Sequence, residues 1–197
     1  MGHGKGRGLF SGTFGARKFL RTINDGGAGG VRVGKPLALP SSYDGPIGLA
    51  EGLASPPSVA HVLRDPGHIA PADDPTRFYS PEERTASMWL ERIGIQTRSV
   101  REYKGDKQKT PDSITTDKRR TLEIKSPTTM SPRTIGQRIE EGSRQSRFVV
   151  IHHTGALDRE TAESALRVAI PRAGKQLDRV IITIGDGNEY VEWRRPR

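Results

Sequence analysis

The sequence predicts an α/β protein of the α+β type, in which helices pack against a mixed β-sheet, over residues 76–197. Two continuous apolar runs, 148–152 and 179–184, are typical of strands covered on both faces. Ser-Pro pairs at Ser80 and Ser131 are typical helix starts, because serine caps a helix and proline fits its first turn. The resulting order is helix, strand, hairpin, helix, strand, helix, strand, strand, which favours one mixed sheet.

The first helix is predicted from Ser80, with Pro81 at its first position and Glu83 as the acid of a capping box. Gly94 ends it, since glycine is favoured just past a helix C-terminus. An extended segment follows over 96–103, and a basic loop over 104–109. The apolar positions of this helix recur at helical spacing: Ala86, Trp89, Leu90 and Ile93.

A hairpin is predicted next, from a strand over 112–116, a basic turn over 117–120 and a second strand over 121–125. The second helix runs from Ser131 to about Gly142 and leads into the buried strand 148–152. Asp158 caps a third helix, which we expect to break near Pro171 because proline removes a helical hydrogen bond. After the strand 179–184, a turn at 186–188 sends the last strand, 189–193, back along it.

Composition divides the chain into two parts. Residues 1–75 hold 15 of the 23 glycines and 8 of the 14 prolines, which predicts a flexible or linker region. Residues 76–197 carry 24 of the 32 Lys and Arg residues against 17 Asp and Glu, and the whole chain has a net charge of +9. A basic domain of this kind favours a polyanionic partner, nucleic acid first.

Several classes of protein are excluded or disfavoured. The chain has no cysteine, which excludes disulfides, thiolate chemistry and a cysteine-ligated zinc site. No apolar run approaches 18 residues, so no membrane span is expected. The first residues are not followed by an apolar core of the signal-peptide type, although delivery as part of a longer polypeptide is compatible with the sequence.

Asp112, Glu123 and Lys125 form the most informative pattern in the chain. Side chains alternate along a strand, so Glu123 and Lys125 share one face, and pairing of the hairpin brings Asp112 close to Glu123. Two close carboxylates repel, and a hard divalent ion such as Mg²⁺ or Mn²⁺ removes that repulsion. A neighbouring lysine can hold or activate a water, which is the chemistry of phosphodiester cleavage. The alternative is a basic hairpin with an incidental ion pair.

This arrangement resembles the PD-(D/E)xK nuclease superfamily, which has the restriction-endonuclease-like fold with flanking helices. The resemblance covers about residues 78–193 and rests on Glu83, Pro111-Asp112 and Glu123-Ile124-Lys125. The whole arrangement looks most like the C-terminal tRNase toxin domains of CdiA-type contact-dependent inhibition proteins and related polymorphic toxins. A Gly/Pro-rich stretch before a compact basic domain fits the tip of such a toxin.

The resemblance implies roles for individual residues. Asp112 and Glu123 become metal ligands, with Glu83 or Glu82 completing the acidic cluster, and Lys125 positions or activates the attacking water. It also implies tRNA as the substrate, an acidic immunity protein as a partner, and delivery of a larger toxin to the cytoplasm of a target cell. A nucleic-acid-binding rim of basic residues is expected around the site: Lys104, Lys107, Lys109, Lys118, Arg119 and Arg120.

Three alternatives remain open at this stage. The enzyme could act on DNA, as a toxin or as a cytoplasmic resolvase-like nuclease, or the chain could be a basic nucleic-acid-binding protein with a decayed site. Glu83 could serve only the capping box. Gln145 is expected at an exposed helix end rather than in a supporting position beside the site. The adjacent His152 and His153 are expected to have structural or surface roles, because neighbouring strand residues point to opposite faces and cannot easily share one ion.

Overall fold

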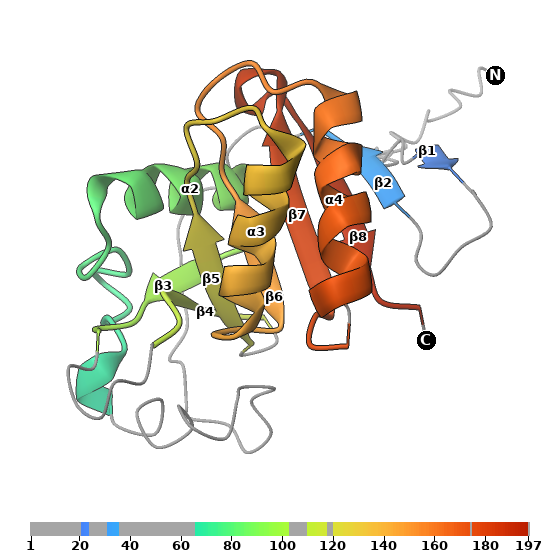
Figure 1. Cartoon of the computed structure of the whole chain (residues 1–197). Coiled ribbons are helices and arrows are strands. Elements are labelled where there is room, and N and C mark those ends of the chain that lie inside the picture. The colour runs from blue at the N-terminus through green and yellow to red at the C-terminus, as the bar shows by residue number, and fades with distance from the viewer. Residues whose placement is uncertain are drawn as a thin grey trace, which may run out of the picture.

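The computed structural model describes residues 21–23, 31–35, 66–102, 110–117, 120–173 and 175–196. Its strands form one mixed sheet in the order β1-β2-β8-β7-β6-β5-β4-β3, in which β5, β6 and β7 are parallel and the other neighbours are antiparallel (Figure 1). The predicted α+β fold with a mixed sheet is therefore confirmed. The strands are β1 (Arg21–Ile23), β2 (Val31–Gly34), β3 (Thr97–Ser99), β4 (Ser113–Thr115), β5 (Thr121–Lys125), β6 (Phe148–Ile151), β7 (Arg179–Ile184) and β8 (Glu189–Arg194).

Helices cover both faces of this sheet, as expected for strands that are apolar on both sides. Helices α3 (Pro132–Ser143) and α4 (Arg159–Ala173) stand side by side on one face (Figure 1), where they pack on Val149, Ile151 and Val180. Helix α2 (Pro81–Arg92) packs on the other face, against Ile124 and Val150. Within the described residues no helix is long and apolar enough to cross a membrane.

The predicted helix starts are confirmed. The Ser80 hydroxyl accepts a hydrogen bond from the Glu83 amide at 3.3 Å, and the Ser80 amide donates to Oε2 of Glu83 at 2.8 Å. Gly94 follows the end of α2 with a φ of +79°, a conformation that glycine adopts without strain. Asp158 caps α4 by accepting a hydrogen bond from the Thr161 amide at 2.7 Å.

The third helix ends close to the expected position, since α4 ends at Ala173, two residues after Pro171. Pro171 is exposed and lies in the last turn of the helix. Only two helical residues follow it, so the hydrogen bond that proline removes disturbs little of the helix.

Part of the region that composition assigned to a linker forms regular structure. Strand β2 pairs with β8, so that Val31 lies opposite Trp193 and Val33 opposite Val191. Closer to α2, Ile69 forms a bridge with Val100. Short strands of this kind escape detection in a Gly/Pro-rich sequence, because one partner strand far away in the chain decides whether they form.

Strand β3 is shorter than the expected segment 96–103. It spans three residues, and its continuation at Val100 is a single bridge to Ile69. The other segments predicted as strands agree with β4 to β8 to within one or two residues.

Candidate active site

The hairpin of β4 and β5 brings the predicted acidic residues together. Antiparallel pairing places Ser113 opposite Leu122, and the same register, continued by one residue, places Asp112 opposite Glu123. Oδ2 of Asp112 accepts a hydrogen bond from the Ile124 amide at 2.7 Å. The Asp112 carboxyl group is therefore anchored to the strand that carries Glu123.

Glu123 is fully buried, with 0% of its surface exposed, because β5 lies between β4 and β6 and the end of α3 covers this face. Its Oε1 accepts hydrogen bonds from Nζ of Lys125 and, at 2.7 Å, from Nε2 of Gln145. Its Oε2 is buried and has no partner among the described residues. A buried carboxylate oxygen without a partner is costly, so this oxygen has unused capacity to hold a cation.

Gly142 makes room for Glu123. A Cβ atom at this position of α3 would lie 3.3 Å from Cγ of Glu123 and 3.0 Å from Cγ1 of Val149. The absence of a side chain at residue 142 thus lets the last turn of α3 approach β5 closely.

Gln145 differs from the sequence expectation. It was expected at an exposed helix end, but only 6% of its surface is exposed and its amide binds Glu123. The turn after α3 explains this, because the amides of Gln145 and Ser146 both donate to the Gly142 carbonyl. Ser146 then donates to the Thr121 carbonyl at 2.7 Å, which holds the turn against β5.

Glu83 lines the same pocket as Asp112 and Glu123, a cavity of about 410 Å³. Glu82 is exposed and is not among the residues that line this cavity. Glu83 therefore combines its place in the capping box with a place at the site, while Glu82 does not. The cavity lies where the start of α2, the end of β3, the β4–β5 hairpin and the turn after α3 meet, and is lined by Phe78, Ser80, Glu83, Val100, Glu102, Thr110, Pro111, Asp112, Glu123, Lys125 and Gln145.

A buried cluster of hydroxyl groups holds these elements in place. The Tyr79 hydroxyl donates to Oγ1 of Thr97 at 2.9 Å and shares a hydrogen bond with Oγ of Ser113 at 2.7 Å. Ser87 joins from α2 through a 2.9 Å contact with Thr97. Burial raises the pKa of Tyr79 to about 12, so its hydroxyl stays neutral. The cluster links the start of α2 to β3 and to the residue after Asp112.

The electrostatics of the pocket are dominated by its acidic groups. Burial, together with the negative charges of Glu123 and Glu83, raises the pKa of Asp112 to about 8. Burial also raises the pKa of Glu123, although Lys125 opposes this shift. Burial acts to lower the pKa of Lys125, but the charge of Glu123 outweighs it and the pKa is raised. At neutral pH the pocket therefore holds a proton on Asp112 and an ammonium group on Lys125.

The donor set fits a small hard cation that keeps much of its own water. Among the described residues no three His, Asp or Glu side chains form a ready-made metal cluster. Mg²⁺, however, is commonly held by one or two carboxylates and otherwise by water and substrate phosphate. Asp112 and the unpartnered Oε2 of Glu123 provide two such oxygens.

The remaining candidates have other roles or cannot be placed. His152 and His153 are both buried, and His153 contacts the Thr129 carbonyl through Nε2 at 3.1 Å, in agreement with a structural role. Trp89 and Trp193 belong to the core. Of the six basic residues expected to form a rim, Arg120 is exposed in the β4–β5 connection. The other five lie outside the described residues: Lys104, Lys107, Lys109, Lys118 and Arg119.

Fold and pocket together define an α+β domain with a buried acidic pocket at the β4–β5 hairpin. No family model matches the chain, and no curated protein sequence matches it. A solved structure that is similar is the CdiA-CT/CdiI toxin and immunity complex from Burkholderia pseudomallei. The match has a TM-score of 0.40 and 20% sequence identity, and it covers 59% of this chain and 90% of that chain.

Proposed function

We propose that this protein is a metal-dependent nuclease that hydrolyses phosphodiester bonds. The observation that carries the proposal is the burial of Asp112 and Glu123 in one pocket beside Lys125, with Oε2 of Glu123 unpartnered among the described residues. Burying two carboxyl groups together is unfavourable, as the raised pKa values of both show. Binding of a cation between the two carboxylates would offset this unfavourable free energy.

Asp112 and Glu123 would hold a divalent ion, Mg²⁺ or Mn²⁺, with Glu83 completing the acidic cluster from α2. The ion would supply positive charge that stabilises the negative charge gathering on the phosphate in the transition state. Gln145 and Lys125 both donate to Oε1 of Glu123, which orients the carboxylate and would leave Oε2 available to hold the ion.

Lys125 acts as a cation in this proposal. Its raised pKa keeps it protonated at neutral pH, so it cannot serve as the base that removes a proton from water. As an ammonium group it can hold the attacking water by a hydrogen bond or neutralise charge on the phosphate. Positioning of the nucleophile, rather than its deprotonation, is the role that fits Lys125.

The proposed substrate is tRNA and the proposed biological role is that of a toxin domain. The net charge of +9 favours a nucleic-acid partner. The resemblance of the whole arrangement to CdiA-type tRNase toxin domains favours RNA as the substrate, cleaved in the cytoplasm of a target cell after delivery within a larger protein. It also supports an acidic immunity protein, which could bind a basic site rapidly and with strong salt dependence.

One assay tests the activity and the substrate together. The protein is incubated with total tRNA, single-stranded DNA and duplex DNA, each with Mg²⁺ or with EDTA. Cleavage of tRNA that requires Mg²⁺ and is lost in Glu123→Gln supports the proposal, and Glu160→Gln on α4 is the matched control. Undiminished cleavage in EDTA would refute the metal-dependent mechanism, and preferential cleavage of DNA would refute tRNA as the substrate.

A second assay tests the biological role. Expression of the wild-type protein in a bacterium without a cognate inhibitor should arrest growth, and Glu123→Gln should relieve the arrest. Harmless expression of a wild-type protein that is active in vitro would contradict the toxin role while leaving the nuclease activity in place.

A further inference from the structure

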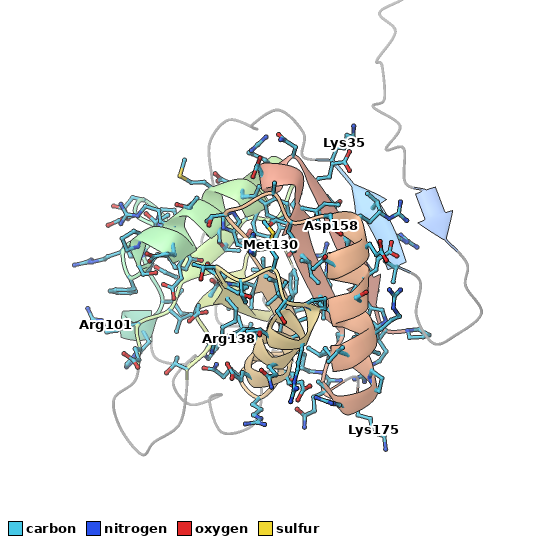
Figure 2. All side chains as sticks on the ribbon, turned by 45° about the horizontal axis from the view of Figure 1, so that its top comes forward. Lys35, Arg101, Met130, Arg138, Asp158 and Lys175 are labelled. Atoms are coloured by element: carbon cyan, nitrogen blue, oxygen red, sulfur yellow. The ribbon has the colours of Figure 1, made fainter. Side chains whose placement is uncertain are left out.

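The wall of the acidic pocket contains an aromatic ring that is stacked with arginine. Phe78 lines the pocket together with Asp112 and Glu123. The guanidinium carbon of Arg101 lies 4.7 Å from the centroid of the Phe78 ring, and that of Arg77 lies 5.9 Å from it. Figure 2 shows Arg101 at the edge of the molecule, on the side away from Lys175. Both arginines are exposed, whereas Phe78 is half-buried.

Hydrogen bonds of the two backbone amides anchor the residues that form this stack. The Phe78 amide donates to Oγ of Ser99 at 3.0 Å, and Ser99 in turn donates to the Pro75 carbonyl. The Arg101 amide donates to the His68 carbonyl at 2.7 Å. The next residue after Phe78 is the tyrosine of the buried hydroxyl cluster. The backbone positions that carry the ring and the Arg101 side chain are therefore held in place before any ligand binds.

We propose that the Phe78–Arg101 stack binds an unpaired nucleobase next to the phosphate that would occupy the acidic pocket. The inference rests on the proposed nuclease function and narrows its substrate to single-stranded or looped nucleic acid. Aromatic rings and guanidinium planes are the surfaces on which proteins stack unpaired bases, and such stacking tolerates any base sequence. The base would stack on the exposed guanidinium of Arg101, which lies over the Phe78 ring in the pocket wall. Phe78 and Arg101 together form this stacking platform.

A continuous duplex cannot use this platform. Its bases are already stacked on their neighbours, and extruding one of them from the duplex costs free energy. A base in a hairpin loop or a single strand is free to stack on the platform without that cost. The site should therefore bind and cleave unpaired nucleotides in preference to paired ones of the same sequence.

The test measures binding without turnover. The probes are an RNA stem–loop with 2-aminopurine in its loop and a fully paired RNA duplex that contains the same labelled strand. Affinity and 2-aminopurine fluorescence are measured with the full chain in EDTA. The wild type should bind the stem–loop more tightly than the duplex, and binding should quench the fluorescence of the loop base because that base becomes stacked.

Two variants remove the platform in different ways. Phe78→Leu removes the ring, and Arg101→Lys keeps the charge but removes the guanidinium plane. Each should weaken binding of the stem–loop about tenfold and leave binding of the duplex unchanged. Arg92→Lys, at the opposite end of α2, is the matched control and should change neither affinity.

The outcomes separate this inference from the proposed function. Equal affinity of the wild type for stem–loop and duplex, or unchanged stem–loop binding in Arg101→Lys, would overturn the inference, even if Mg²⁺-dependent cleavage is found. Loss of metal dependence with a retained loop preference would overturn the proposed function alone. If Phe78→Leu does not fold, the inference is tested by the fluorescence quenching with the wild type and by the affinity of Arg101→Lys for the stem–loop.

Discussion

Replacing Asp112 with asparagine should make the metal-free protein less sensitive to rising pH. Asparagine preserves the shape of the side chain and an oxygen that can accept the hydrogen bond from the Ile124 amide. It removes a carboxyl group whose pKa is raised from 3.8 to about 8 in the folded protein. The folded wild type therefore holds a proton on Asp112 that the unfolded chain releases above about pH 4.

The sign and the size of the effect follow from this difference in bound protons. A carboxyl group whose pKa is raised on folding contributes its full stabilisation at pH values below its pKa in the unfolded chain. That contribution is lost as the pH rises through its pKa in the folded protein. Between pH 5 and 7, Asp112 alone lowers the free energy of unfolding by about 1.4 kcal/mol per pH unit. The wild type should thus lose about 3 kcal/mol over this interval relative to Asp112→Asn.

Urea unfolding at pH 5 and pH 7 in EDTA measures this difference. Glu160→Gln, an exposed position on α4, is the control and should follow the wild type. Parallel pH dependence of the wild type and Asp112→Asn would show that Asp112 titrates normally, and would refute the argument that burial beside Glu123 and Glu83 raises its pKa.

Three further predictions concern the surroundings of the site. Glu83→Gln should reduce cleavage strongly while Glu82→Gln leaves it unchanged, because only Glu83 lines the pocket, and initial rates with Mg²⁺ decide between them. Gly142→Ala should lower both cleavage and the melting temperature, since overpacking costs about 1–3 kcal/mol and the gain in helix propensity offsets only about 1 kcal/mol. A fully active and more stable variant would contradict the close approach of α3 to β5. Deleting residues 1–75 should lower the melting temperature more than deleting 1–65, because the backbone hydrogen bonds of Ala70 and Pro75 to β3 contribute about 1 kcal/mol each. Equal melting temperatures would show that these hydrogen bonds do not stabilise the fold.

Local signals in the sequence predicted the elements that position the site. The capping box at Ser80 placed the start of α2, and with it Glu83, at the residue where the structure has it. Alternation along a short strand placed Glu123 and Lys125 on one face, and the two side chains form an ion pair. Signals of this kind are short in range, because a cap or a strand face is decided by residues within four positions.

The features that the sequence did not predict depend on contacts between distant segments. The sequence around Gln145 predicts an exposed helix end. In the structure, the turn after α3 directs the Gln145 side chain towards Glu123, 22 residues earlier in the chain. Strand β2 is short and lies in a Gly/Pro-rich region, so only its pairing with β8 makes it a strand.

The most direct test of the central claim is the binding of a divalent ion by Asp112 and Glu123. Isothermal titration calorimetry with Mn²⁺ at pH 7, in two buffers of different ionisation enthalpy, measures both the stoichiometry and the protons released. The wild type should bind the ion and release about one proton, since Asp112 must lose its proton to become a ligand. Asp112→Asn and Glu123→Gln should each abolish binding. Binding by the wild type without proton release, or undiminished binding by both variants, would contradict the account.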